Sequence, residues 1–389
     1  MKYEVFWKNP GYKSRPELKE DIECDYLIVG GGVAGVSLAY FLSKKTNKKI
    51  VLIEKNTIAS GATGKAAGSL VLEGELDLLQ IIKKYGKKKG LEFWKINKST
   101  LEDIKNLVKK EKIKCDFSQE NTIYGSMNKK GDAIVLDEYI AQKDIESETK
   151  LLVGKELIDK INTPLFKYIM LSPKHGISVN PLMFTQNLSN VVNKNGVKIY
   201  ENTTLTKLYE NHNMAETPKG NIKFKEVILA IDSDVRNSKV KKISSTIIVT
   251  EPLKKSELKH LSLLPKKIIW DSKDIYHYMK ITKDNRILLG YGDKHISKKR
   301  TSIDPHQPHL KRIESFLHKL FPHLHKKIEY AWSGHFGTTE EKLPIMERKG
   351  TQITFAGAAS QVSCVMAAQY ISDKLTGRKS KLEPFFNIE

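Results

Sequence analysis

Apolar and polar residues near the start of the chain predict a strand, a turn, a helix and a second strand. Residues 26–29 form an uninterrupted apolar run, which is typical of a buried parallel strand. Val36, Ala39, Tyr40 and Leu42 then recur at helical spacing. Residues 50–53 form a second apolar run. Together these segments have the length of a βαβ unit, about 30 residues.

The rest of the pattern alternates between two kinds of element. Pro181 suits the first turn of a helix that ends at Asn195-Gly196, and residues 282–285 form a hairpin turn. We predict helices over 87–114, 181–195, 307–320 and 363–375, and strands over 197–200, 204–209, 222–225, 227–231, 244–250, 275–281, 286–292, 328–332 and 352–358. Parallel βα units thus stand at both ends of the chain and antiparallel segments between them. This order predicts a two-domain α/β protein in which each domain is discontinuous.

Three glycines between the first strand and the first helix satisfy G-x-G-x-x-G. Gly30 permits the tight turn, Gly32 lets the backbone approach a diphosphate, and Gly35 lets the helix lie close to the sheet. The diphosphate would lie at the helix N-terminus, where free N–H groups and the helix dipole favour an anion. Glu54 closes the second strand, 22 residues after Gly32, and its carboxylate can accept hydrogen bonds from ribose hydroxyls. The alternative is a glycine turn that packs a helix without a ligand.

A second stretch of small residues, ASGATGKAAGSL at 59–70, favours FAD over NAD. A simple NAD domain does not need it, whereas a long ligand between two domains needs backbone amides and small side chains that approach a flavin ring. The alternative is a flexible surface loop.

Charge and cysteine content limit the partners and the compartment. The net charge of +21 would attract nucleic acid or acidic ligands, but the lysines are scattered, so nucleic acid is an unlikely partner that composition does not exclude. No apolar run approaches a membrane span, and the N-terminus lacks the apolar run of a signal peptide. Three distant cysteines suit a reducing compartment, and we expect a cytoplasmic protein. Four histidines at 306, 309, 323 and 325 lack partners at ligand spacing, so we expect no metal site.

Over essentially its whole length the sequence resembles the D-amino-acid oxidase/glycine oxidase/sarcosine oxidase (DAO) family of flavoproteins, and most of all the branch that includes gamma-glutamylputrescine oxidase. The resemblance rests on DYLIVGGGVAGVSLAYFL, SGATGKAAG, NGVKIYENTTLTKLYEN, STIIVTEPL, ITKDNRILLGYG, IEYAWSGHFGTTEEKLPI and ITFAGAASQVSCVMAAQYISDKLTGR, which follow the family in order and spacing.

The resemblance implies an α/β fold with a Rossmann-like FAD-binding domain and a second α+β substrate domain that contains a large, mainly antiparallel sheet. The FAD-binding domain would comprise 21–85, 176–240 and 325–389, and the substrate domain 86–175 and 241–324. It further implies non-covalent FAD, held by Gly30, Gly32, Val33, Ala34, Gly35, Glu54, Lys55, Ser60, Gly61, Ala62, Thr63, Gly64, Lys65, Ala67, Gly68, Leu205, Ala230, Gln361, Val362 and Ser363. The helix that begins near Gln361 would direct its positive end at the flavin N1/C2=O edge.

The implied reaction oxidises a C–N bond of a small amine or amino-acid-like substrate by hydride transfer to flavin N5. Phe336 stands where glycine oxidases carry an arginine for the substrate carboxylate, which points to amines rather than simple α-amino acids. Leu288 stands where sarcosine oxidases carry the lysine that promotes the oxygen reaction, so the electron acceptor is oxygen or an unknown compound. Ser333 replaces the cysteine that carries covalent flavin, and Gln361-Val362-Ser363 replaces a glycine-histidine-glycine turn.

His335 is the candidate catalytic residue, and Tyr276, Tyr291 and Phe336 are the candidate substrate residues. His335 can orient an amine, but a structural histidine is an equal alternative, and ordinary sheet packing is an alternative for each tyrosine. Two other functions remain open: a flavin-dependent enzyme that acts on a modified tRNA base, and a catalytically impaired flavoprotein relative.

Overall fold

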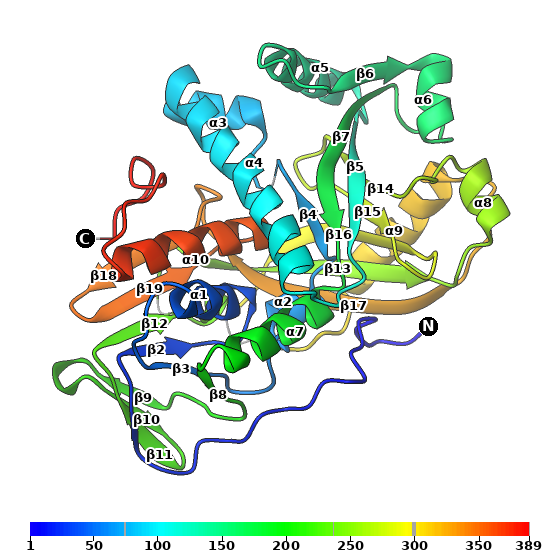
Figure 1. Ribbon diagram of the computed structural model, residues 1–389. Helices are drawn as coiled ribbons and strands as arrows, with labels where there is room; N and C mark the ends of the chain where they lie inside the picture. Colours follow the sequence, from blue (N-terminus) through cyan, green and yellow to red (C-terminus); the bar gives the residue numbers. More distant parts are fainter. Residues whose placement is uncertain (74, 236, 298–300, 389) are drawn as a thin grey trace.

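The predicted βαβ unit lies inside a six-stranded sheet. The computed structural model describes residues 1–73, 75–235, 237–297 and 301–388 (Figure 1). The strand order is β18-β19-β12-β2-β3-β8, and every neighbouring pair is parallel except β18 with β19. The strands are β2 (Tyr26–Val29), β3 (Ile50–Ile53), β8 (Lys198–Tyr200), β12 (Glu226–Leu229), β18 (Ile345–Lys349) and β19 (Gln352–Ala356). The parallel strands of this sheet are the ones that the apolar runs predict.

The two faces of this sheet have different covers. Because side chains alternate along a strand, Ile28 and Leu52 pack under helices, while Leu27 and Val51 pack against a four-stranded sheet. The helices on the first face include α1 (Val33–Ser43), α4 (Lys87–Lys110), α7 (Pro181–Lys194) and α10 (Gln361–Leu375). The small sheet has the order β1-β11-β10-β9, with β1 (Ile22–Glu23), β9 (Lys207–Tyr209), β10 (Met214–Thr217) and β11 (Gly220–Lys223).

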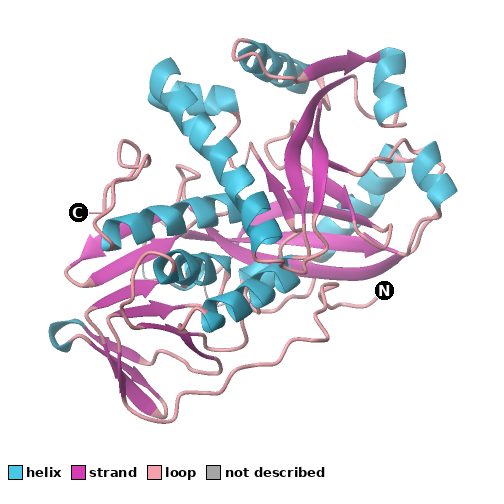
Figure 2. Cartoon of the chain, in the orientation of Figure 1, coloured by secondary structure: helices cyan, strands magenta, loops and turns pink. Residues whose placement is uncertain are grey.

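A nine-stranded sheet forms the other half of the molecule (Figure 2). Its order is β17-β13-β16-β15-β14-β5-β7-β4, β6 pairs with β7, and β14 with β5 is its parallel pair. This confirms the mainly antiparallel sheet. The strands are β4 (Ser69–Val71), β5 (Ser118–Gly125), β6 (Lys150–Val153), β7 (Tyr168–Ser178), β13 (Lys241–Thr250), β14 (Lys267–Asp271), β15 (Tyr278–Ile281), β16 (Ile287–His295) and β17 (Ile328–Thr338).

The large sheet packs α9 (Gln307–Leu320) on one face and turns its other face toward the parallel sheet. Ile248 and Leu289 pack with α9, whereas Ile247 and Leu288 pack on the opposite side. The remaining helices are α2 (Ala62–Lys65), α3 (Leu78–Tyr85), α5 (Lys129–Lys143), α6 (Gly154–Lys160), α8 (Lys255–His260), η1 (Glu210–His212) and η2 (Asp232–Asp234). Within the described ranges, no helix is long and apolar enough to cross a bilayer.

Two strands connect the halves directly. β4 and β17 belong to the large sheet, although the sequence boundaries given above place their residues in the cofactor domain. The two halves therefore share an interface along β17 and β4, and the exact domain boundaries stay a prediction.

Candidate cofactor site and adjacent cleft

Two glycines of the predicted turn are required by close backbone contacts. Gly30 has φ +114°, and a Cβ there would lie 2.3 Å from the Ala230 carbonyl oxygen. A Cβ on Gly35 would lie 2.0 Å from the carbonyl oxygen of Gly30. The structure thus places the turn against the end of β12, where Ala230 was predicted to line the cofactor.

Gly32 differs, because the space in front of it is open. Among the described atoms, a Cβ on Gly32 would approach only Thr63 Oγ1, at 3.2 Å. Gly32 is the N-cap of α1, and it provides no side-chain cap; the first turn of the helix has no acidic residue. The Val33 N–H donates to Thr63 Oγ1 at 3.0 Å. An uncapped helix start with open space before it suits a diphosphate.

Glu54 is fixed beside this turn. Its Oε2 accepts from the Gly31 N–H at 2.7 Å and its Oε1 from the Asn56 N–H at 2.9 Å. Leu205 lies nearby, because the Thr203 N–H donates to the Glu54 carbonyl and Leu205 packs between the two smaller sheets. Lys55 instead extends to Asp234 at 2.7 Å on the surface.

Residues 60–68, which we call the cofactor loop, contain α2 and lie between the glycine turn and the large sheet. Thr63 contacts α1, whereas the Lys65 carbonyl accepts from Trp332 Nε1 of β17 at 2.9 Å. Ser60 Oγ is buried without a hydrogen-bond partner among the described residues. Burial lowers the pKa of Lys65, and the charges of Lys242 and Lys55 lower it further. A half-buried cation that lies near other cations suits an anionic ligand.

The start of α10 supplies the other wall. Ser360 caps the helix by accepting from the Ser363 N–H at 3.0 Å, and its hydroxyl donates to Ser363 Oγ at 2.9 Å. Val362 is buried in the core. Both amide atoms of Gln361 are buried and lack a partner in the described part of the chain. Because buried polar atoms are rarely left unpaired, Gln361 and Ser60 indicate that a polar ligand belongs here.

Asp232 follows β12 at a position where the backbone has a positive φ, which glycine adopts most easily. Its φ is +50°, a region that aspartate tolerates better than most residues. Its Oδ2 accepts from the Gly337 N–H at 2.9 Å, which ties η2 to β17. Burial raises the pKa of Asp232 to about 6.

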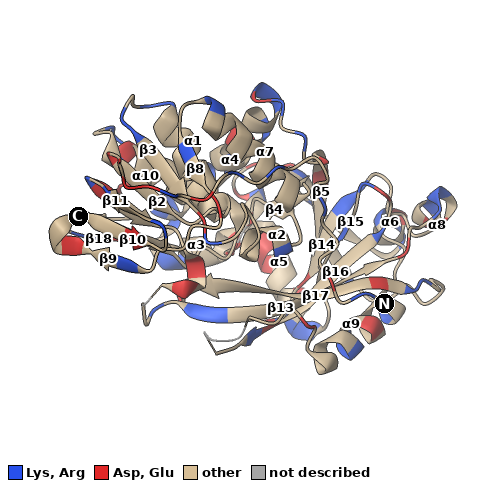
Figure 3. Cartoon of the chain, turned by 90° about the horizontal axis from the view of Figure 1, so that it is seen from below, with Lys and Arg blue, Asp and Glu red and all other residues tan. Residues whose placement is uncertain are grey.

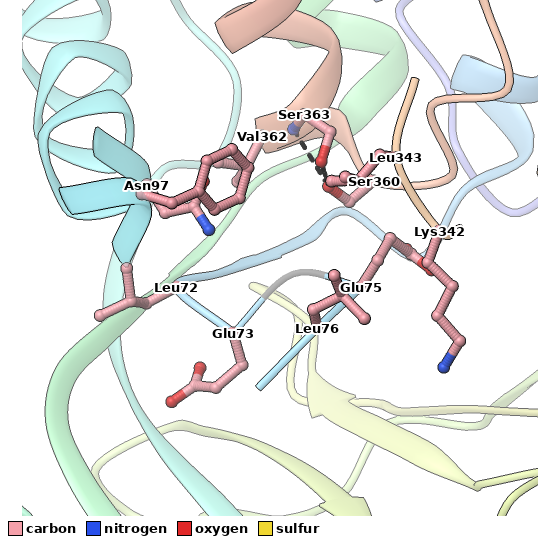
Figure 4. A pocket seen from close by; sticks show the side chains of 11 residues that line it. Leu72, Glu73, Glu75, Leu76, Asn97, Lys342, Leu343, Ser360, Val362 and Ser363 are labelled. Atoms are coloured by element: carbon pink, nitrogen blue, oxygen red, sulfur yellow. Dashed lines mark hydrogen bonds between the residues drawn. The ribbon is translucent and has the colours of Figure 1, made fainter. Parts of the chain in front are cut away.

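A narrow cleft opens beside the start of α10 (Figure 4). It is lined by Leu72, Glu73, Glu75, Leu76, Phe93, Asn97, Lys342, Leu343, Ser360, Val362 and Ser363. Burial raises the pKa of Glu75 to about 7; the negative charge of Asp293 raises it further and Lys342 opposes the shift. Burial also raises the pKa of Asp293. The cleft therefore joins the predicted cofactor wall to the carboxyl group of Glu75, whose charge Asp293 influences from outside the lining.

The candidate substrate tyrosines occupy different faces of the large sheet. Tyr276 is 36% exposed and its ring centroid lies 6.0 Å from that of Tyr278. Burial raises the Tyr276 pKa, and the charge of Glu75 raises it further. Tyr291 instead stacks on His277 at 4.3 Å and accepts from Arg312 at 3.3 Å, among the residues that pack against α9. The structure thus does not bring Tyr291 to the cleft.

Strand alternation along β17 separates the remaining candidates. Trp332 and Gly334 both approach the Lys65 carbonyl, and Phe336 continues on their face. His335 lies on the opposite face with Gly337, whose Cα adjoins Asp232. Ser333 also points away from the cofactor loop and donates to the Asp304 carbonyl at 3.2 Å. The catalytic role of His335 stays a prediction.

Sequence reasoning overlooked Glu75, Asp293, Trp7 and Lys280. The Trp7 and Lys280 side chains are buried and contact the cofactor loop. The sequence signal for Lys280 was a charged residue inside the apolar strand YMKI, two residues after Tyr278 and therefore on the same face of the strand. Among the described residues, no group of three or more His, Cys, Asp or Glu side chains is arranged to hold a metal.

The glycine turn, Glu54 and the start of α1 together suit a dinucleotide. Residues 25–373 match the family model described as FAD dependent oxidoreductase (DAO), and the chain belongs to this family, whose cofactor is FAD. Gamma-glutamylputrescine oxidoreductase from Escherichia coli (strain K12) is 26% identical over 95% of this chain and 88% of its own.

Two solved structures share the fold. Glycine oxidase from Geobacillus kaustophilus has a TM-score of 0.80 at 16% identity and covers 93% of this chain and 98% of its own. L-proline dehydrogenase from P. horikoshii has a TM-score of 0.77 at 18% identity and covers 95% of this chain and 96% of its own.

Proposed function

We propose that this protein oxidises a C–N bond of a small amine or amino-acid-like substrate, with the pair of electrons passing to FAD. The observation that carries the proposal is the cleft that joins the start of α10 to the carboxyl group of Glu75. The Gln361 amide at this helix start has no partner among the residues that the structure describes. Bound FAD supplies a hydride acceptor. The substrate carbon gives up the hydride, the amine nitrogen loses a proton, and water hydrolyses the resulting imine to a carbonyl compound and an amine or ammonia.

The relatives support the reaction class. Gamma-glutamylputrescine oxidoreductase, glycine oxidase and L-proline dehydrogenase are named for substrates that carry a C–N bond. We assign FAD binding to Gly30–Gly35, Glu54, the cofactor loop and the start of α10, with no covalent bond because neither Ser333 nor Gly334 offers a thiol.

The charges around the cleft favour a cationic substrate. Glu75 lines the cleft, and its charge interacts with Asp293 and Tyr276. The rings of Tyr276 and Tyr278 lie 6.0 Å apart. Carboxylates and aromatic rings both attract an ammonium ion. Phe336 lies on the face of β17 that approaches the cofactor loop, and it cannot bind a carboxylate. We therefore expect amines to be better substrates than simple α-amino acids.

Lysine and arginine residues are spread over both halves of the molecule, with acidic residues among them (Figure 3). This distribution supports a small-molecule substrate over a nucleic acid. The cysteines Cys24, Cys115 and Cys364 are buried and unpaired, which supports our proposal of a cytoplasmic protein.

Anaerobic mixing of the FAD-loaded protein with a panel of amines, diamines and α-amino acids tests the proposal. We expect at least one amine to bleach the flavin about tenfold faster than glycine or proline does. Fastest bleaching by a simple α-amino acid would contradict the choice of amines, and no bleaching by any compound with a C–N bond would contradict the reaction. Reoxidation with dissolved oxygen then shows whether oxygen is the acceptor.

A further inference from the structure

The first 20 residues, which we call the N-terminal arm, cross both halves of the molecule in an extended conformation (Figure 1). At one end the Lys2 N–H donates to the Glu329 carbonyl at 2.7 Å, and the Ala331 N–H donates to the Lys2 carbonyl at 3.0 Å. At the other end Leu18 is buried and its N–H donates to Thr203 Oγ1 at 3.1 Å. The arm precedes residues 25–373, which the family model matches.

Three buried donors meet three carbonyls near the end of the cofactor loop. Trp332 Nε1 donates to the Lys65 carbonyl at 2.9 Å, and Trp7 Nε1 of the arm donates to the Ala66 carbonyl at 2.8 Å. Lys280 Nζ donates to the Gly68 carbonyl at 2.9 Å. The donors come from β17, the arm and β15, so three segments distant in sequence hold the same short stretch of backbone.

Lys280 is an unusual donor, because it is 2% exposed and its hydrogen bonds go to backbone carbonyls, those of Gly68 and Val179, each at 2.9 Å. Its ammonium also lies 5.0 Å from the centre of the Trp7 ring. Burial lowers its pKa to about 7. A buried ammonium is costly, and an apolar side chain would fill the same space at less cost. The contacts that the charge makes with the loop carbonyls and with Trp7 therefore account for its presence.

The arm also holds the chain just before the cofactor loop. Glu201 is fully buried, and its carboxylate accepts from the Tyr12 hydroxyl at 2.8 Å and from the Arg15 N–H at 2.6 Å. The same carboxylate accepts from the Ile58 N–H at 2.6 Å. The arm thus supports both ends of the segment from Ile58 to Gly68, through Glu201 at one end and Trp7 at the other.

We propose that the N-terminal arm is a component of the FAD site, and that Trp7 and Lys280 are positioning residues for the cofactor loop. By fixing the carbonyls of Ala66 and Gly68 toward the large sheet, they hold the opposite side of the loop in the conformation that receives the cofactor. The proposal rests on the assignment of the cofactor loop to FAD, and it is independent of the substrate. Because a preorganised site loses less entropy on binding, the loss of either donor weakens FAD binding.

Trp7→Phe and Lys280→Met test this proposal, with Trp94→Phe as the matched control. Trp94 is a buried tryptophan of α4, so its replacement changes core packing without reaching the loop. For each protein we would measure the dissociation constant of FAD by fluorescence titration of the apoprotein, and the thermal midpoint of the apoprotein. We expect the dissociation constant to rise about tenfold or more in Trp7→Phe and Lys280→Met, and to stay at the wild-type value in Trp94→Phe.

The thermal midpoint separates positioning from general stability. Lys280→Met removes a buried charge, which favours stability, but it also leaves the Gly68 and Val179 carbonyls without this donor, which opposes it. The apoprotein should therefore stay folded while it binds FAD more weakly. If Trp7→Phe does not fold, Tyr12→Phe, which removes a hydrogen bond from the arm to Glu201, tests the arm in its place, and Lys280→Met still tests the second positioning residue. Wild-type FAD affinity in the folded variants would overturn the proposal, as would an equal loss of affinity in Trp94→Phe. A wild-type protein that takes up no FAD would instead overturn the cofactor assignment, and a failure of every amine to reduce bound FAD would overturn the proposed function alone.

Discussion

Alanine at Gly35 should lower stability, whereas alanine at Gly32 should lower cofactor affinity and leave stability almost unchanged. A Cβ on Gly35 would lie 2.0 Å from the Gly30 carbonyl oxygen, whereas real Cβ contacts essentially never fall below 3.0 Å. The turn or α1 must therefore move by about 1 Å, a change that costs roughly 1–3 kcal/mol in a packed core. Gly35→Ala should lower the thermal midpoint of the apoprotein.

Gly32→Ala should leave the apoprotein folded, because Gly32 has φ −74° and its Cβ would approach Thr63 Oγ1 at 3.2 Å. We expect a stability change within about 1 kcal/mol. The methyl group would nevertheless occupy the space assigned to the diphosphate, so FAD affinity should fall by about 100-fold or more, which corresponds to about 2.7 kcal/mol.

Fluorescence titration of each apoprotein with FAD, combined with its thermal midpoint, checks both expectations. Wild-type affinity in Gly32→Ala would refute the placement of the diphosphate. A loss of affinity that merely follows a loss of apoprotein stability in both variants would show that the glycines serve packing alone.

Three further predictions concern single side chains. Glu75→Gln should raise the KM for a cationic amine about tenfold with less effect on kcat, because it removes a carboxylate from the cleft; steady-state kinetics with an unchanged KM would contradict this. Phe336→Arg should create a carboxylate site and increase kcat/KM for α-amino acids relative to amines, and an unchanged ratio would argue against the place of Phe336 near the substrate. Burial raises the pKa of Asp232 from 3.8 to about 6. Between these two pH values the folded state binds more protons than the unfolded state. This group therefore makes the free energy of unfolding fall as the pH rises from about 4 to about 6. Asp232→Asn should therefore stabilise the protein more at about pH 7 than at about pH 4. Urea titrations at the two pH values measure this difference, and an equal effect at both would refute the raised pKa of Asp232.

The sequence predicted the parallel sheet well, because buried strands and amphipathic helices have clear periods. It did not predict β5 and β7. Pro173 and Gly176 lie inside β7, and proline removes a donor from the ladder. The pairing of β5 with β7 also shifts between Glu120 and Thr122, which breaks the alternation that sequence reasoning depends on.

The candidate site was predictable where function follows a local motif. Gly32 and Glu54 lie in one βαβ unit, so their positions follow from spacing. Tyr291 was harder to place, because alternation puts it on the same face as Leu289, and the sequence did not show that this face packs against α9. Trp7 lies far in sequence from the loop that it holds, and no local pattern reports such a contact.

The most direct test of the account is the visible spectrum of the purified wild-type protein, with its flavin released by denaturation and quantified. We predict flavin absorption near about 450 nm and about one FAD for each chain, released without proteolysis because the bond is not covalent. A colourless protein that takes up no FAD when the cofactor is supplied would contradict the account.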